Sequence, residues 1–394
     1  MIRQLLIILI AVSLLGSYAH AQGQESTEGL DMQAARAKMM TARGRKIAYT
    51  KKWDLNGLPK YQPQQKVSGT IRIWGSNYIA DGLLGGYWEA AFRKYHPDAK
   101  FDFHMKTTLA AVPSLIFGVS DLGIGRKITF SEQELFERYT DRGPIEIELM
   151  TGSYDVPGWN PGFGIVVHKD NPVTQLTMKQ LDGIFGAERL GGWEGTSWRP
   201  QYARGPAENI RTWGQLGLTG EWADKPINVY GLNLRYHQAM EISDLLLKGS
   251  DKWNERLRIY ANYVSASGKL ERGLNEDLAR DRYGIAYIAA PTTNLGGQAA
   301  QPELKVLKVA EKEGGPYVPY TLDTIQDRTY PLYDRIYAYT DRVPGKPMDP
   351  RVLEFLRFVL SQEGQAEVMR DGKYLPLTAE VARAQMKKLE AAGK

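Results

Sequence analysis

Hydrophobic and polar positions follow two periods along most of the chain, one typical of strands and one typical of helices. The apolar or alternating segments predict strands, and they are TIRIWG, AKFDFHM, DLGIG, IEIELMTG, GFGIVVHK, INVYG, YGIAYIA and YPLYDRIYAYTD. Between them lie segments whose apolar residues recur every three or four positions, such as Leu84, Trp88 and Phe92 in the helix expected over residues 78–97. Strands that alternate with helices predict parallel sheets covered by helices on both faces.

Several expected helices have recognisable ends. Thr177 is placed to cap TMKQLDGIFG, and Ser131 with Glu134 has the spacing of a capping box before ELFERY. The segment AAVPSLIFGVS is expected to be helical in its second half, and HQAMEISDLLLKG is expected to end at Gly249. Asp349 precedes a proline and is expected to cap a helix pair, or one broken helix, over residues 350–372.

The first residues are typical of a secretory signal peptide. Arg3 precedes an apolar run over residues 5–15, and Ala19-His20-Ala21 has the small-x-small pattern of a cleavage site. The alternative, a membrane anchor, would need about 20 apolar residues. We therefore expect cleavage near Ala21 and a periplasmic or secreted product. Residues 22–66 are polar and are expected to form a loosely packed extension, with a helix over residues 31–43 and an ordered fold that begins at Ser68.

Composition narrows the possible functions. The 394 residues suggest two or three domains. The chain has no cysteine, which excludes disulfides, thiolate catalysis and cysteine-ligated metals. The formal net charge of +5 comes from basic residues interleaved with acidic ones, so no basic stripe favours nucleic-acid binding. A small anionic ligand is compatible with this charge.

The sequence offers little support for an enzyme. The five histidines lack the spacing of a zinc site, and the chain has no nucleophile elbow, Walker A motif or dinucleotide-binding glycine loop. Glu146 and Glu148 lie on one face of an expected strand, where acidic pairs are usually solvated. An exported hydrolase would need a nucleophile–base set that is absent here. We therefore expect no catalytic residue, metal or cofactor.

Polar residues follow three expected strands where each strand ends. Gly75-Ser76-Asn77 follows TIRIWG, Thr107 and Thr108 follow AKFDFHM, and Arg126 follows DLGIG. Helix N-termini have free amides and a dipole that favours anions, and a small turn lets a ligand approach them. Each feature alone is more often a helix cap than a site. Together they predict an anion site, because α/β sheets bind ligands at the carboxyl ends of their strands.

A family resemblance rests on six segments in order: IRIWGSNYIADGL, TTLAAVPSLIFGVSDLGIGRKIT, IVVHKDNPVTQLTMKQLDGIFG, GIAYIA, YPLYDRIYAYTDR and LRFVLSQEGQAEVMRDGKYLPL. The chain resembles the phosphate-binding periplasmic proteins of ABC uptake systems. The resemblance implies a type II, two-lobed α/β fold with mixed sheets, helices on their faces and two crossing hinge segments. It implies a monomer that delivers its ligand to an ABC permease. The expected organisation is a signal peptide (1–21), an extension (22–66), lobe one (67–154 and 330–394) and lobe two (155–329, with an insertion at 187–211).

The resemblance also implies which residues bind the ligand. The first phosphate loop of the family falls on the residues that follow Gly75, its hydroxyl loop falls near Thr108, and an acidic residue of well-known members falls on Arg126. The second-lobe loop, which is Ser-Gly-Thr in the family, falls on bulkier residues beside Arg235. The implied ligand-binding set is Gly75, Ser76, Asn77, Tyr78, Thr108, Arg126, Arg235, Tyr236, His237 and Gln238.

These departures leave three functions open. The first is capture of phosphate or a related oxyanion. The second is binding of a larger organic anion or a sugar phosphate stacked on Tyr236. The third is an interaction protein that has lost solute binding and contacts a partner through residues 187–211 and 22–66. Because an arginine has donors only, Arg126 predicts weak discrimination between phosphate and sulfate. A proton acceptor from His237 or a nearby acid such as Asp121 would reverse that prediction.

Overall fold

The computed structural model describes residues 48–81, 83–155, 160–234, 236–261, 273–291 and 301–393. The chain divides into two units, residues 1–47 and 48–394, and the first unit lies outside the described residues. The signal peptide and the helix expected over residues 31–43 therefore stay predictions. Within the described ranges, no helix is both long enough and apolar enough to cross a bilayer.

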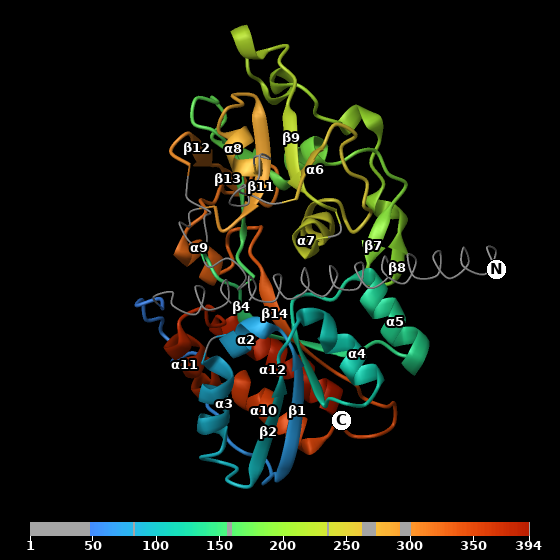
Figure 1. Ribbon diagram of the computed structural model, residues 1–394, viewed down its shortest axis with the longest axis vertical. Coiled ribbons are helices and arrows are strands. Elements are labelled where there is room, and N and C mark those ends of the chain that lie inside the picture. Colours follow the sequence, from blue (N-terminus) through green and yellow to red (C-terminus); the bar gives the residue numbers. More distant parts are fainter. Residues whose placement is uncertain are drawn as a thin grey trace, which may run out of the picture. The chain divides into compact units, whose positions relative to one another are not determined.

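The first of two five-stranded sheets has the strand order β2-β1-β3-β14-β4 (Figure 1). Its strands are β1 (Gly69–Gly75), β2 (Ala99–His104), β3 (Leu122–Gly125), β4 (Ile145–Thr151) and β14 (Arg335–Thr340). Strands β2, β1 and β3 pair in parallel, whereas β14 pairs antiparallel with both β3 and β4. The sheet is therefore mixed, as the family resemblance implies, and not purely parallel.

Helices cover both faces of the first sheet. Ile336 and Ala338 of β14 belong to a core with α3, α10, α11 and α12, and the alternate residues Tyr337 and Tyr339 pack with α4 and α5. The helices on these faces are α3 (Leu84–Phe92), α4 (Ala111–Ile116), α5 (Phe130–Thr140), α10 (Pro350–Val359), α11 (Gln362–Asp371) and α12 (Ala379–Gly393). The period of two along a strand explains why consecutive residues enter different cores.

The second sheet has the order β10-β9-β11-β5-β12. Its strands are β5 (Phe163–His168), β9 (Asn228–Leu232), β10 (Arg258–Tyr260), β11 (Gly284–Ala289) and β12 (Leu304–Val306). Strand β5 runs antiparallel to β11 and β12, and the other pairs are parallel. Helices α6 (Met178–Phe185), α7 (His237–Leu246) and α8 (Leu274–Leu278) pack here, with α7 against β9. Helix α9 (Leu322–Gln326) and the parallel pair β6 (Gln175–Thr177) and β13 (Lys308–Ala310) complete this part.

Two segments connect the sheets and lie side by side. The Gly152 N–H donates to the Asp334 carbonyl at 2.9 Å, and the Phe163 N–H donates to the Leu332 carbonyl at 2.8 Å. The Asn160 amide also donates to the Asp334 carboxylate at 3.0 Å. The expected α/β fold with mixed sheets and two crossing segments is confirmed. The lobe boundaries given above stay predictions.

Residues 48–66 are not a loose extension. Leu55, Leu58 and Tyr61 are buried in the core of the first sheet, and Trp53 packs against the core of the second. The Tyr61 hydroxyl donates to the Glu354 carboxylate at 2.9 Å. The expectation that the ordered fold begins at Ser68 is therefore wrong, because aromatic and leucine side chains in this polar segment have enough apolar surface to pack.

The structure corrects several expected helix limits. The helix expected over residues 78–97 is split into α2 (Asn77–Asp81) and α3. Thr129 and Glu132, not Ser131 and Glu134, form the capping box of α5. Helix α4 begins at Ala111, earlier than expected, and α12 was not expected at all.

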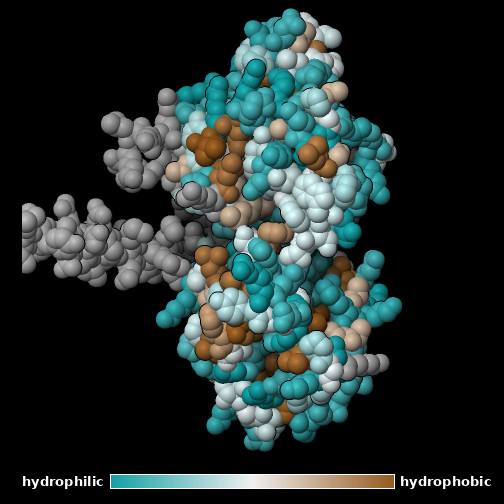
Figure 2. Space-filling model, turned by 90° about the vertical axis from the view of Figure 1, so that its right-hand side faces the viewer, coloured by the Kyte–Doolittle hydropathy of each residue, from teal (hydrophilic) through white to brown (hydrophobic). Residues whose placement is uncertain are grey.

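The segment 187–211 is ordered, as expected. It contains the hairpin of β7 (Gly192–Glu194) and β8 (Ser197–Arg199) and the 3₁₀ helices Pro200–Tyr202 and Pro206–Glu208. Arg189 fixes it to α6 through two hydrogen bonds of 2.6 Å to Asp182. Two further 3₁₀ helices follow, Trp213–Leu216 and Gly220–Trp222. On the face seen in Figure 2, apolar side chains form small groups separated by hydrophilic ones.

Candidate functional site

The turn after β1 is fixed by a glycine. Gly75 has φ +140°, and a Cβ atom placed on it would lie 1.9 Å from the Ile124 carbonyl oxygen of β3. The next residue, Ser76, donates its N–H to that same oxygen at 2.8 Å. The close approach of the two strand ends therefore requires glycine and sets the position of Ser76, with Asn77 buried as the first residue of α2.

Two buried hydroxyls lie near this turn. Ser76 is 1% exposed, and neither its Oγ nor the Tyr374 hydroxyl makes a hydrogen bond of normal geometry among the described residues. The two hydroxyls nevertheless interact: burial raises the pKa of Tyr374, and the nearby Ser76 side chain opposes this shift. Tyr78 and Asp334 also affect the pKa of Tyr374. Buried polar groups that lack a hydrogen bond of normal geometry are uncommon, which singles out these two hydroxyls at the end of β1.

Two more of the predicted residues lie at the neighbouring strand end. Thr108 begins the 3₁₀ helix Thr108–Ala110, and its Cγ2 is 2.5 Å from where a Cβ on Gly125 would lie. Arg126 directly follows Gly125 and β3, which pairs with β1 up to Gly75. The structure therefore brings residues 75–78, Thr108 and Arg126 to the ends of adjacent strands of one sheet.

Arg126 does not present a free guanidinium. The residue is 6% exposed, and its two Nη atoms donate to the Glu132 carboxylate at 2.9 and 3.3 Å. Nη1 also donates to the Lys127 carbonyl at 2.6 Å. Burial lowers the pKa of Arg126, but Glu132 raises it, and the result lies above the ordinary value. Arg126 thus stays charged, with much of its bidentate face occupied by Glu132.

The start of α7 lies near Arg126. Tyr236 is the N-cap residue without a side-chain cap and is 42% exposed, and Gln238 is half-buried. His237 is accessible, yet the surrounding protein and the charge of Arg126 lower its pKa to about 4. His237 is therefore neutral at pH 7. Arg235 lies outside the described residues.

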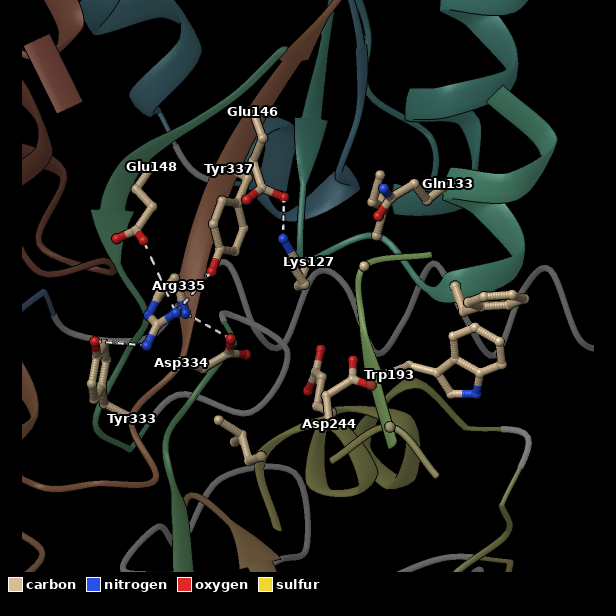
Figure 3. A pocket seen from close by; sticks show the side chains of 16 residues that line it. Lys127, Gln133, Glu146, Glu148, Trp193, Asp244, Tyr333, Asp334, Arg335 and Tyr337 are labelled. Atoms are coloured by element: carbon tan, nitrogen blue, oxygen red, sulfur yellow. Dashed lines mark hydrogen bonds and ion pairs between the residues drawn. The ribbon is translucent and has the colours of Figure 1, made fainter. Parts of the chain in front are cut away.

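A cavity of about 290 Å³ lies between the first sheet and α7. Figure 3 shows Asp244 on the opposite side of it from Glu146 and Tyr337. Polar lining residues are Lys127, Gln133, Glu146, Glu148, Glu241, Asp244, Tyr333, Asp334, Arg335 and Tyr337, and the aromatic residues Phe130 and Trp193 add an apolar wall. None of the ten predicted ligand residues belongs to the described lining, so the cavity adds a second set of residues to the site.

Three carboxylates in this cavity have raised pKa values. Burial and the neighbouring Asp334 raise the pKa of Glu241 well above its ordinary value. Burial also raises the pKa of Asp334 to about 6, although its contacts with Arg335 and Asn160 oppose the shift. Asp244 is exposed, yet the surrounding protein raises its pKa to about 6, a shift that Lys127 and Arg126 oppose. Each shift has the same physical cause, the loss of water around a negative charge.

The remaining charged lining groups are paired. Lys127 contacts Glu146, and Glu148 accepts from Arg328 at 2.6 Å. Arg335 donates to the hydroxyls of Tyr337 and Tyr333 at 3.2 and 2.7 Å, and its guanidinium lies over the Tyr333 ring. Glu146 and Glu148, expected on one solvated strand face, keep 21% and 17% side-chain exposure and face the cavity from β4.

Most of these lining residues carry no sequence signal. Glu132, the partner of Arg126 outside the lining, has a sequence signal, because Thr129 and Glu132 have the spacing of a capping box two residues before Ser131 and Glu134. The roles of Glu241 and Asp334 could not be predicted from the sequence. Glu241 lies in α7 and Asp334 directly precedes β14, and these two parts of the chain meet only when it is folded. Asp121 is bonded to Arg72 at 2.7 and 3.1 Å. Among the described residues, no group of three His, Cys, Asp or Glu side chains is arranged to hold a metal ion.

Comparisons with known proteins cover most of the chain. The family model of a PBP superfamily domain matches residues 61–363. Two relatives from strains of Pseudomonas aeruginosa, both named phosphate-binding protein PstS, are 32% identical over 336 residues, 84% of this chain and 90% of each relative. The crystal structure of PstS from Borrelia burgdorferi is 17% identical and covers 79% of this chain and 100% of that chain, with a TM-score of 0.48. An ABC-type phosphate transport receptor from Vibrio cholerae is 18% identical and covers 78% and 99%, with a TM-score of 0.46.

Proposed function

Because the chain belongs to the PBP superfamily, we propose that it is a solute-binding protein that captures phosphate or a related oxyanion between its two sheets. It delivers this ligand to the permease of an ABC transporter. It acts as a monomer in the periplasm or outside the cell and performs no chemistry. Nucleic acid is not among its partners.

The observation that carries this proposal is the buried Ser76 hydroxyl at the carboxyl end of β1, whose neighbouring polar group is the Tyr374 hydroxyl. Hydroxyls can donate to an oxyanion, and the turn at Gly75 holds Ser76 close to the end of β3, where Arg126 follows. Asp334 affects the pKa of Tyr374 and is itself affected by Arg126. The hydroxyls and the guanidinium thus belong to one electrostatic neighbourhood.

Calorimetric titration with phosphate tests the proposal. We expect Ser76→Ala to weaken phosphate binding about tenfold, the lower range for loss of a hydrogen bond to a charged group. Ser131→Ala, which removes an exposed hydroxyl on α5, is the matched control and should leave the affinity unchanged. If the folded wild-type protein binds no phosphate, sulfate or other small anion, solute capture is wrong and the interaction-protein alternative is favoured.

A larger organic anion is the second candidate. The cavity between the first sheet and α7 favours it, because its volume of about 290 Å³ exceeds what inorganic phosphate needs. Native mass spectrometry of the purified protein would distinguish the two ligands by the mass that the protein retains.

A further inference from the structure

The cavity has room beyond an inorganic oxyanion. At roughly 30 Å³ for each water, 290 Å³ holds about ten water molecules, several times the size of phosphate. The aromatic rings of Phe130 and Trp193 line it with centroids 4.7 Å apart. A site with this volume and these walls suits a ligand that continues past its phosphate group.

Glu241 lines the cavity without a partner. The residue is 9% exposed, and its Oε1 has no hydrogen-bond partner among the described residues. The charged neighbours that act on it are Asp334 before β14, Arg126 after β3 and Asp244 on its own helix. Arg126 is the one cation among these neighbours, and its guanidinium already donates two hydrogen bonds to the Glu132 carboxylate. A buried carboxylate in such surroundings lacks the counter-charge that usually accompanies one.

The other walls do not supply that counter-charge. Lys127 contacts Glu146, and Arg335 contacts tyrosine hydroxyls and lies near Glu148 at 4.0 Å. Asp244, one helical turn from Glu241, extends into the same cavity (Figure 3). The α7 side of the cavity is thus acidic, and the electrically complementary group is a cation.

We propose that the ligand is a phosphoester or phosphonate that also carries an amine, with its ammonium group bound between Glu241 and Asp244. This inference rests on the proposed function, because it places the phosphate group beside Arg126, which does not line the cavity but whose charge acts on both Glu241 and Asp244. Trp193 and Phe130 bound the ammonium end of the cavity, where an aromatic face attracts an organic cation. The two carboxylates ionise against the ammonium, and the ligand supplies the charge that the protein lacks.

Phosphoethanolamine and ethyl phosphate form the test pair, because they share the phosphate and the two carbons and differ in the amine. In calorimetry at pH 7 we expect phosphoethanolamine to bind at least tenfold more tightly, as expected for a hydrogen bond between charged groups. Equal affinities, with inorganic phosphate still bound, would overturn this inference and leave the proposed function standing. If none of the three compounds binds to the folded protein, both proposals fail.

Variants test which residues cause the preference for phosphoethanolamine over ethyl phosphate. In Glu241→Gln the affinity for phosphoethanolamine should fall and the affinity for ethyl phosphate should rise. The ratio of these two affinities should therefore approach one. Asp244→Asn should reduce the ratio severalfold and provides the test if the buried Glu241 variant does not fold. Glu134→Gln, an exposed position on α5, should keep the wild-type ratio. An unchanged ratio in folded Glu241→Gln, or in Asp244→Asn if that is the only folded variant, would overturn the assignment.

Discussion

The turn after β1 and the start of α7 are both strand-to-helix connections beside Arg126, but they are built differently. At the turn, Gly75 and the Ile124 carbonyl fix the backbone, and a buried hydroxyl follows. At α7, Tyr236 and His237 are accessible, and two carboxylates that line the cavity come one and two turns later, at Glu241 and Asp244. The first connection is specified by backbone geometry and the second by side-chain charge, so different substitutions should damage them.

The largest effect is expected at Gly75. Gly75→Ala should destabilise the protein by about 3 kcal/mol or more, because its Cβ would overlap the Ile124 carbonyl and the backbone has φ +140°. Gly86→Ala is the control, since Gly86 lies in α3 with open space around it. It should stabilise the protein by up to about 1 kcal/mol. Urea unfolding measures the change in the free energy of unfolding for both variants. A change in Gly75→Ala as small as that in Gly86→Ala would show that the backbone at Gly75 can relax.

The next largest expected effect is a loss of phosphate affinity, which distinguishes the turn after β1 from the start of α7. Arg126→Ala should weaken phosphate binding by roughly 1.5–3 kcal/mol, the range for hydrogen bonds to a charged group. His237→Ala should change it less than about threefold, because a neutral imidazole with a pKa of about 4 adds no charge at pH 7. Calorimetry on both variants gives the comparison. A larger loss in the histidine variant would place the anion at α7 instead.

The acidic side of the cavity predicts a pH effect on stability. The pKa of Asp244 is raised to about 6 in the folded protein, so ionisation of Asp244 opposes folding. This penalty is full above pH 6, fades as the pH falls toward 4 and vanishes below the ordinary aspartate pKa. Asp244→Asn should therefore stabilise the protein by about 1 kcal/mol at pH 7.5, a value reduced for solvent screening, and not at pH 3.5.

Urea unfolding at the two pH values measures this difference. Asp224→Asn, an exposed carboxylate in the same part of the chain, should show no such dependence. An equal gain at both pH values in Asp244→Asn would mean that the charge is not its cause.

The smallest effect concerns selectivity between oxyanions. Because Arg126 has donors only, phosphate and sulfate should differ in binding free energy by less than about 1.4 kcal/mol. Binding should also weaken with salt, because a charge contributes to it. Calorimetry with both anions at two pH values checks this. A phosphate preference of a thousandfold, about 4 kcal/mol, would require a proton acceptor, and Asp334 would be the candidate.

The fold could be predicted further than the site. The strand periods, the Thr177 and Asp349 caps and the family segments were enough for two mixed sheets with two crossing segments, because these depend on local pattern. The burial of Tyr61 could not be predicted, since its partners His96 and Glu354 lie far along the chain. The placement of Gly75, Ser76, Thr108 and Arg126 at adjacent strand ends followed from strand order. The pairing of Arg126 with Glu132 and the cavity beside α7 depend on side-chain directions, which one sequence does not encode locally.

The packing of residues 48–66 implies that part of the native core forms late in folding. Tyr61 bonds to Glu354 across 293 positions, its N–H bonds to Glu363 across 302, and the Trp53 N–H reaches the Met369 sulfur across 316. Contacts of such sequence separation form slowly, because loop closure must precede them. This early segment completes its packing only when α10 and α11 are available, although Tyr61 also contacts His96 nearer in the sequence. The first sheet also lacks β14 until then, so the native core is completed only when nearly the whole chain is available.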